Sequence, residues 1–368
     1  MNIPLAQPQI TSQDRQAVLK VLKTKQLSLG PKLVEFEKKM ADYIGVKYAI
    51  AVSSGTAGLH LIIRALDLKK DDEVITTPFS FIASSNCLLY EQVKPVFIDI
   101  DPRDLNIDIA KIESAITPKT KAILAVDIFG QPARWLKLRQ IAAKHHLALI
   151  EDSAEALGTE YQNKKCGGLG DAGVFAFYPN KQITTGEGGM VVTNNKKIAE
   201  LCRGLRNQGR GTSHWLKHQH LGYNYRLSEL NCALGISQLS RIDQIVLRRQ
   251  KIATTYNQLL KNIPGIILPN VASTNKISWF VYVVQIKNRD QIMARLKQQG
   301  VQCNNYFPVI HLIPFYQKMF GYKKGDFPVA ETISQKTLAL PFFNQITQAQ
   351  IKYVVQQLLS VIARTPHF

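Results

Sequence analysis

The sequence predicts an α/β protein with two domains: a large one with a mainly parallel seven-stranded sheet between helices, and a smaller C-terminal α+β domain. Short apolar runs alternate with longer amphipathic segments between residues 47 and 193, which is typical of parallel strands covered by helices on both faces. A linker-like stretch at 264–276 then precedes one expected strand and two expected helices. We therefore place the large domain at residues 1–260 and the small domain at 261–368.

The expected strands of the large sheet are apolar runs separated by helical or turn-forming segments. They cover residues 48–52, 73–76, 96–100, 122–126, 148–150, 172–177 and 190–193. Helical periodicity occupies the gaps at 56–66, 81–90, 109–115 and 136–145. The last strands follow one another without clear helices between them, so the sheet need not be wholly parallel.

Further helices are expected on either side of this alternating region. Two helices are expected before it, at 12–22 and 32–43. After it we expect a helix at 196–206, a polar loop at 208–221 and one long helix at 228–260. The small domain is expected to hold a strand at 279–286 and helices at 290–299 and 348–362.

Composition and charge indicate a globular, cytoplasmic protein. The 368 residues are 45% hydrophobic and 20% charged, and no apolar run reaches the roughly 18–20 residues that cross a bilayer. The chain starts without a secretory signal pattern, and its 5 cysteines are never in CxxC spacing, so we expect neither a disulfide framework nor a metal site. The net charge of +19 is spread through the sequence, and we expect no nucleic-acid or membrane partner.

The most informative stretch is 175–190, which places Lys181 between an apolar run and a glycine-rich turn. Upstream, Asp152 follows the apolar run 147–150 at the carboxyl end of an expected strand, the edge where α/β proteins bind ligands. Pyridoxal phosphate (PLP) enzymes need these two groups, an amine for the Schiff base and a carboxylate for the pyridine nitrogen. The ordinary alternatives are a solvated surface lysine and an aspartate that caps a helix.

Two segments upstream of this pair fit the same chemistry. Ser54, Gly55 and Thr56 lie in a turn that joins a strand to a helix, where free backbone N–H groups bind phosphate. The alternative is that this turn only caps the helix and binds no phosphate. Phe81 opens the next helix, and it either stacks on a cofactor ring or packs in the core.

A third segment, Gly222-Tyr-Asn-Tyr-Arg226, lies downstream of the lysine, just before the long helix. Asn224 and Arg226 are spaced so that both can reach a phosphate or a carboxylate. The alternative is a solvated polar loop.

The order SSGTA, TPFSF, EDSAEALG, FAFYPNK with EGGM five residues later, and GYNYR resembles the DegT/StrS-type nucleotide-sugar aminotransferases, which are fold-type I PLP enzymes. The resemblance covers nearly the whole chain, from 27–31 to 325–331. It implies a PLP cofactor and a homodimer with shared active sites. The implied reaction moves an amino group, usually from glutamate, to a keto-sugar on a nucleoside diphosphate, in amino-sugar, surface-polysaccharide or glycoside biosynthesis.

The resemblance also implies roles for single residues. Lys181 forms the Schiff base and shuttles a proton, Asp152 binds the pyridine nitrogen, and Glu155 contacts the ring hydroxyl or nearby substrate. The other implied cofactor contacts are Ser54, Gly55, Thr56, Phe81 and, from the second subunit, Asn224. The implied substrate contacts are Pro31, Tyr178, Arg226 and His311.

Three positions depart from the pattern of this family. Ala176 stands where many relatives have a phosphate-binding serine, which shifts that role toward Tyr178 or Asn180. Asp127 stands where histidine is frequent, and Asn304-Asn305-Tyr306 occupies a stretch where some close relatives are basic. The last two departures bear on the sugar and the nucleotide, not on the cofactor chemistry.

Other functions stay open. Some members of the family are sugar dehydratases with histidine at the Schiff-base position, and Lys181 argues against that branch. Other fold-type I PLP enzymes, dehydratase-like ones among them, keep the lysine. A remote alternative is a non-catalytic regulatory or nucleic-acid-binding protein, which the basic charge suggests and the intact lysine and aspartate oppose.

Overall fold

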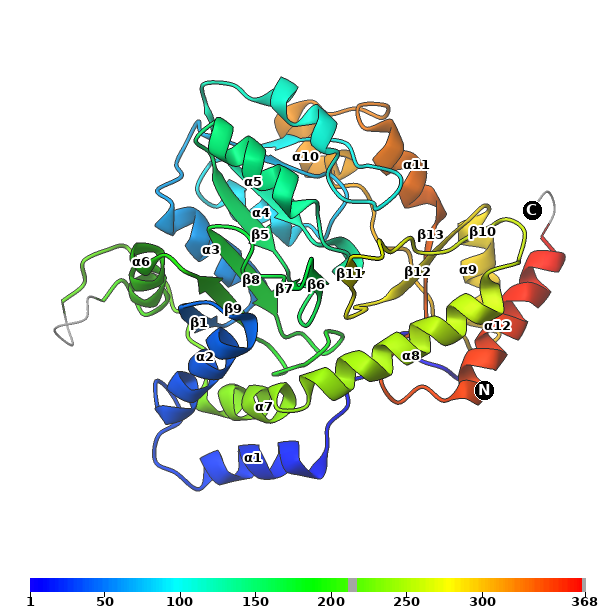
Figure 1. Ribbon diagram of the computed structural model, residues 1–368, viewed down its shortest axis with the longest axis horizontal. Helices are drawn as coiled ribbons and strands as arrows, with labels where there is room; N and C mark the ends of the chain where they lie inside the picture. Colours follow the sequence, from blue (N-terminus) through cyan, green and yellow to red (C-terminus); the bar gives the residue numbers. More distant parts are fainter. Residues whose placement is uncertain (211–216, 366–368) are drawn as a thin grey trace.

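The computed structural model describes residues 1–210 and 217–365 and is built on one large central sheet (Figure 1). In the described residues this sheet has seven strands in the order β1-β9-β8-β5-β4-β2-β3. Their bounds are β1 Tyr48–Val52, β2 Glu73–Thr76, β3 Lys94–Phe97, β4 Thr120–Val126, β5 Ala148–Asp152, β8 Ala172–Ala176 and β9 Gly189–Thr193. Neighbours are parallel except at β9, which is antiparallel to β1 and to β8. The predicted α/β class with a mainly parallel sheet is confirmed.

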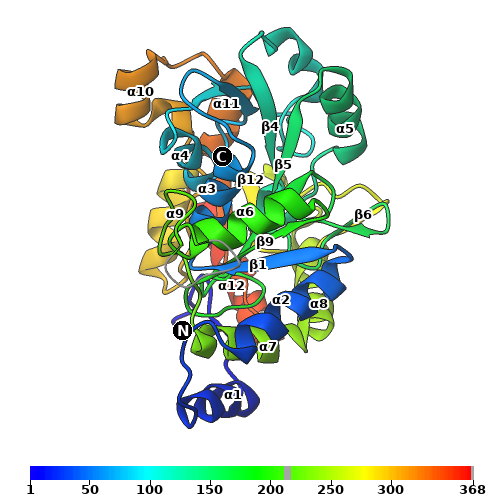
Figure 2. The same ribbon diagram turned by 90° about the vertical axis from the view of Figure 1, so that its left-hand side faces the viewer.

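Helices cover both faces of this sheet (Figure 2). Successive side chains of each strand point to opposite faces, and both sets are apolar. Along β1, Ile50 and Val52 join the core beneath α3 and α6, whereas Ala49 and Ala51 join the core beneath α2. The first face carries α3 (Gly55–Ala65), α4 (Ala83–Leu89) and α6 (Lys196–Arg206), and the second α2 (Pro31–Ile44), α5 (Trp135–Lys144) and α7 (Glu229–Leu239).

A smaller antiparallel sheet, β10-β12-β13, has a separate apolar core. Its elements are β10 Ile266–Ile267, β12 Tyr282–Ile286, β13 Thr337–Leu340, α9 Arg289–Gln298 and α12 Gln348–Ala363. The helix α8 (Ile242–Leu260) runs between the two cores (Figure 1): Ile242 and Ile245 pack below the large sheet, whereas Ile252 and Tyr256 pack on the small one. The division of the chain at residue 260 stays a prediction.

Several sequence expectations are corrected by the structure. The single helix expected at 228–260 is two helices, α7 and α8, because the chain turns at Ser240 and Arg241. There the Arg241 guanidinium turns to the buried Asp14 of α1 (Ser12–Leu22), which also accepts hydrogen bonds from α7. The helix expected at 109–115 forms only two short 3₁₀ turns, Ile109–Lys111 and Glu113–Ala115.

Some elements were not expected at all. They include α10 Pro314–Phe320, α11 Pro328–Lys336, the strands β10 and β13 of the smaller sheet, and a third sheet of β6 Glu160–Tyr161, β7 Lys164–Lys165 and β11 Asn275–Lys276. Each is short, and the strands have two to four residues, so periodicity had too few positions to reveal them. Among the helices of the described ranges, none is long and apolar enough to cross a membrane.

The start of α2 is capped by a carboxylate that is remote in sequence. Glu229 Oε1 accepts the backbone N–H groups of Gly30 (3.1 Å) and Leu33 (2.8 Å), and its Oε2 accepts that of Lys32 (2.8 Å). Pro31 has no N–H, so this one side chain satisfies the available donors where the helix begins. Any side chain at Gly30 would collide with Glu229, since a Cβ there would lie 2.7 Å from Oε2. The contact joins α2 to α7.

We predict that Glu229→Gln destabilises the protein by about 1–3 kcal/mol, because the amide nitrogen would face backbone N–H donors and leave one of them unpaired. Chemical denaturation measured by circular dichroism checks this. The control is Glu35→Gln, which weakens only exposed ion pairs with Lys32 and Lys39 on the same helix. Equal losses in the two variants would contradict the capping role.

Candidate active site

A cavity of about 430 Å³ opens at the carboxyl edge of the large sheet. It lies where the ends of β4, β5 and β8 meet the first turns of α3 and α4, and the C-terminal part of the chain closes one side. Its lining includes Ser54, Gly55, Thr56, Ser84, Phe81, Asp152, Glu155, Ala176, Tyr178, Asn180, Lys181, Phe280, Tyr306 and Phe307. The residues predicted for the cofactor from this chain therefore line one cavity.

Lys181 sits in the turn that follows β8. Its backbone N–H donates to the Tyr178 carbonyl (2.9 Å), which closes the turn. The Nζ atom lies 3.5 Å from Glu155 Oε1 and 4.0 Å from the centroid of the Phe280 ring. Only 13% of the side chain is exposed, so Lys181 is not an ordinary solvated lysine.

Asp152 is the last residue of β5 and is buried in the wall of the cavity. Ser84 Oγ donates to its Oδ2 (2.7 Å), and the Ala154 N–H donates to its Oδ1 (3.1 Å). No helix follows, because the chain forms turns after Asp152, and the helix-cap alternative is therefore wrong. Burial raises the pKa of Asp152, while the hydrogen bond from Ser84 and the charge of Lys181 act in the opposite direction.

Glu155 lies in the turn after β5 and faces the Lys181 amine. Its Oε2 accepts the backbone N–H of Phe129 (2.9 Å), which leaves Oε1 toward Lys181. Gln182 holds the same turn, because its side-chain amide donates to Ser278 Oγ (2.8 Å) and to the Glu155 carbonyl. Burial raises the pKa of Glu155, and the Lys181 charge lowers it.

The first turn of α3 forms one wall of the cavity. Ser54 is the N-cap, and its Oγ accepts the N–H of Ala57 (3.0 Å), which leaves the preceding N–H groups of Gly55 and Thr56 without helical partners. A Cβ at Gly55 would lie 2.8 Å from the Cβ of Ala176, so glycine is needed for this close approach. Ala176 offers only a methyl group here.

Aromatic side chains close the opposite side. Phe81 is 60% exposed, so it does not pack in the core as one alternative had it; the buried Phe79 does so instead. Phe81 precedes the helix, which begins at Ala83 and not at residue 81. Its ring lies 6.4 Å from that of Phe307, which stacks on Tyr306 at 4.9 Å.

The remaining predicted residues lie away from this chain's own cavity. Asn224 is exposed, Pro31 is the first residue of α2, and Arg226 donates to Asn207 Oδ1 (3.1 Å). His311 is fully buried, with Nε2 3.0 Å from Glu331 Oε1 on α11. The roles of these residues stay predictions, and for His311 its position in this chain offers no support.

The sequence interpretation did not identify some residues that line the cavity. One of them is Ser84, which lies three positions after Phe81. Another is Ser80, whose hydroxyl hydrogen-bonds that of Ser84 (2.8 Å). Phe280 and Phe307 were also missed because they belong to the C-terminal part and reach the cavity only through tertiary folding. No local motif marks these two aromatics.

Comparisons with known proteins agree with this site. The sequence profile of the DegT/DnrJ/EryC1/StrS aminotransferase family matches residues 8–359. GDP-perosamine synthase from Caulobacter vibrioides is 37% identical over 367 residues, which cover 98% of each chain. The structure of PseC from Helicobacter pylori, an aminotransferase involved in the biosynthesis of pseudoaminic acid, has a TM-score of 0.95 and 31% identity, covering 99% of this chain and 100% of that one.

The fold is also that of a protein solved with PLP. The PLP form of the putative sugar aminotransferase Spr1654 from Streptococcus pneumoniae has a TM-score of 0.95 at 24% identity, covering 99% of each chain. Fold and cavity together define the scaffold of a PLP-type aminotransferase. The chain belongs to the DegT/DnrJ/EryC1/StrS aminotransferase family, whose aminotransferases are PLP-dependent and include sugar aminotransferases.

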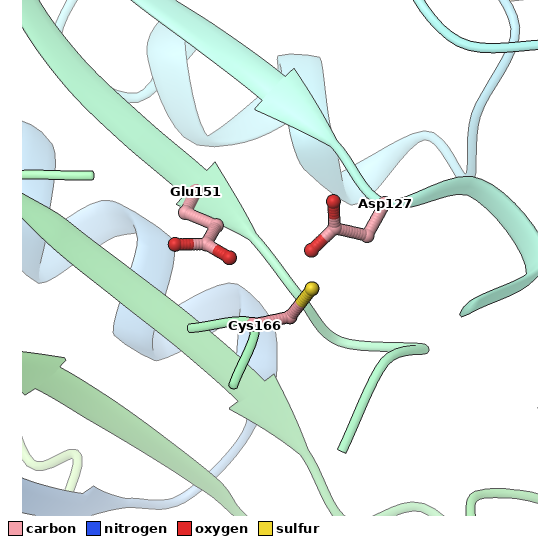
Figure 3. Close-up of side chains that lie close together, drawn as sticks. All are labelled: Asp127, Glu151 and Cys166. Carbon is pink, nitrogen blue, oxygen red and sulfur yellow. The ribbon is translucent and has the colours of Figure 1, made fainter. Parts of the chain in front are cut away.

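Behind the cavity, on the other face of β5, lies a buried acid pair (Figure 3). Glu151 on β5, Asp127 at the end of β4 and Cys166 point toward one another, and one ligand-type atom from each lies within 4.8 Å of the others. Every carboxylate oxygen already accepts a hydrogen bond. The donors are Ala133 N–H, Trp135 Nε1, Ser153 Oγ, and the N–H groups of Gly167, Leu169 and Gly170.

The geometry of this pair favours a proton on one of the two acids. Ser153 Oγ lies 2.6 Å from Asp127 Oδ2 and 3.0 Å from Glu151 Oε1, yet its hydroxyl has a single hydrogen to donate. A proton on one carboxyl group satisfies both contacts. Burial raises the pKa of Asp127, and burial together with the Asp127 charge raises the pKa of Glu151.

We predict that Asp127→Asn stabilises the protein above neutral pH by about 1–2 kcal/mol. Asparagine keeps the acceptor for Ala133 and Trp135, and its amide can donate to Ser153. A raised carboxyl pKa means that the wild type loses stability as pH rises from the ordinary carboxyl range through the folded value. The gain should therefore be large at about pH 8.5 and small at about pH 5.5 in thermal unfolding.

The control is Asp71→Asn, an exposed aspartate outside the cluster. A stability difference between Asp127→Asn and wild type that does not change with pH would contradict the shared proton.

Proposed function

We propose that this protein is a PLP-dependent aminotransferase that moves an amino group from glutamate to a keto-sugar carried on a nucleoside diphosphate. The observation that carries the proposal is the meeting of three groups in one cavity: the Lys181 amine, the Asp152 carboxylate and the free N–H groups at the start of α3. The family membership supports amino transfer, and the relatives' names support a sugar substrate.

The residues present fit PLP in each of its functional parts. Lys181 would hold the aldehyde carbon, Asp152 the pyridine nitrogen, and Gly55 and Thr56 the phosphate through their N–H groups and the helix dipole. Asn180 lines the same cavity, and its Oδ1 has no hydrogen-bond partner among the residues that the structure describes. When bound, PLP accepts an amino group from one substrate, gives it to the next, and withdraws electrons through its ring.

The chain's own residues supply the remaining tasks. Asp152 is held by Ser84 and Ala154 so that its carboxylate is oriented before a ligand arrives, and it would keep a proton on the ring nitrogen. Lys181, between Glu155 and the Phe280 ring, would move the proton between the substrate carbon and the cofactor carbon. Tyr306 and Phe307 would keep water away from that position.

We also propose a homodimer with shared active sites, and two features of the chain's surface support it. Asn224 is exposed, and large apolar side chains are exposed along residues 19–34. These are Leu19, Leu22, Leu27, Leu29 and Val34. Exposed apolar side chains are typical of contact surfaces, and in the proposed dimer a second copy of the chain would cover them and bring Asn224 to the phosphate site of its neighbour.

We expect desalted protein that has been incubated with PLP to be yellow, to lose the colour with glutamate, and to regain it when a nucleoside-diphosphate keto-sugar is added. Lys181→Ala should retain no colour after desalting, because no amine remains to hold the aldehyde. Absorbance spectroscopy follows each step, and a panel of keto-sugar nucleotides identifies the acceptor. The control is Lys32→Ala, which removes an exposed lysine of α2. An unchanged spectrum in Lys181→Ala would remove the basis of the proposal.

Mixed dimers test the shared site. We expect Lys181→Ala and Asn224→Ala chains to hold little PLP when each is purified alone. When the two are co-expressed with different tags, the hybrid should hold PLP at one of its two sites, because Lys181 of one chain then meets Asn224 of the other. PLP content measured after alkaline release reports this result. A hybrid with no more PLP than its parents would mean that Asn224 serves its own chain.

A further inference from the structure

The segment that carries Asn224 has a rigid backbone. The N–H of Tyr223 donates to the Leu205 carbonyl (2.7 Å), and that of Tyr225 to the Arg206 carbonyl (3.0 Å), both at the end of α6. The Tyr223 carbonyl accepts the N–H of Gln208 (2.9 Å). The backbone on both sides of Asn224 is therefore fixed to α6, which lies beside α3 on one face of the sheet (Figure 2).

The side chains of this segment point in opposite directions. Tyr223 and Tyr225 pack on the core around α3, with their rings stacked at 4.9 Å and 11°. Asn224 between them is exposed. This alternation is that of an extended chain, and it directs the amide of Asn224 away from its own subunit.

A partly buried carboxylate, Glu91, holds Tyr223 directly and Tyr225 through His60. Its Oε1 accepts from Tyr223 Oη (3.1 Å) and from His60 Nε2 (2.8 Å), and its Oε2 accepts from Arg64 Nη1 (3.0 Å). His60 Nδ1 is then free to accept the hydroxyl of Tyr225 (3.1 Å). Each hydroxyl of the tyrosine pair is thus tied to the same buried cluster.

The same helix carries both the anchor and the phosphate turn. His60 and Arg64 project from α3, whose first residues, Gly55 and Thr56, line the cavity. The N–H of Ser53, just before that turn, donates to the Tyr225 carbonyl (2.9 Å). The turn that starts α3 and the segment with Asn224 are therefore directly hydrogen-bonded to each other.

We infer that His60, Glu91, Tyr223 and Tyr225 are positioning residues, which hold Asn224 in place for the cofactor phosphate bound by a second copy of this chain. The inference rests on the proposed function, because it needs PLP and a shared site. None of the four residues lines the cavity of its own subunit, so they can act on cofactor affinity only through the segment that they anchor or through α3. The double-mutant cycle with Asn224 separates these two routes. The hydroxyls of Tyr223 and Tyr225 and the carboxylate of Glu91 thus act on phosphate binding indirectly, through the position of Asn224.

The test compares PLP with pyridoxal, which has the same aldehyde and ring but no phosphate. Glu91→Gln weakens the three-donor anchor while keeping its shape, and it should lower the affinity for PLP roughly fivefold, with that for pyridoxal unchanged. Tyr223→Phe, which removes a single hydroxyl, should act in the same direction with a smaller effect. Absorbance titrations of desalted apoprotein measure both affinities, and Glu113→Gln, at an exposed glutamate that pairs with Lys144, is the control.

A double-mutant cycle separates positioning from a general loss of structure. In the Asn224→Ala background, Glu91→Gln should change PLP affinity less than twofold, because the group that it positions is gone. Equal losses for PLP and pyridoxal, or effects of the two substitutions that simply multiply, would overturn the inference. A wild-type protein that binds PLP no more tightly than pyridoxal would overturn the proposed function together with it.

Discussion

The strongest constraint on this protein is the pair of adjacent carboxylates at the end of β5. Strand alternation sends Asp152 into the cavity and Glu151 to the opposite, buried face. Glu151 accepts backbone N–H groups from Gly167, Leu169 and Gly170, which fixes the turn that leads into β8. The turn after β8 carries Lys181. The end of β5 therefore positions Asp152 directly, and it positions Lys181 through the contacts of Glu151.

The loop after β4 contacts residues on both faces of β5, Glu151 on the buried face and Glu155 beside the cavity. Asp127 shares the buried proton network with Glu151, and two residues later the Phe129 N–H holds Glu155, which in turn faces Lys181. A change at position 127, one of the departures from the family pattern, therefore acts first on the packing beneath the site. Its effect on sugar choice would have to pass through Phe129 and Phe307, whose rings stack at 5.6 Å.

The sequence predicted that Lys181, Asp152 and the turn at residues 54–56 lie at one edge of the sheet, because the signals that place them are local. A strand, a turn of small residues and a helix follow one another within a few positions, and backbone rules alone place such groups at the carboxyl edge of a parallel sheet. Most strands and helices of the large sheet were also predicted, because apolar runs and amphipathic helices of ordinary length carry strong periodicity. The strand expected at 96–100 is an exception, since β3 covers Lys94–Phe97. The break between α7 and α8 was missed because it depends on Asp14, more than two hundred positions away.

What the sequence determined by itself was the class of fold and the chemistry of the groups at one edge of its sheet. Tertiary structure decided which aromatic rings enclose the amine, which two acids meet at the Ser153 hydroxyl, and that His311 turns to Glu331 rather than to the cavity. It also directed Asn224 outward by packing Tyr223 and Tyr225 on α3. The physical reason is range: backbone geometry and periodicity act over a few residues, whereas burial, close contact and a shared proton depend on segments that meet only after folding.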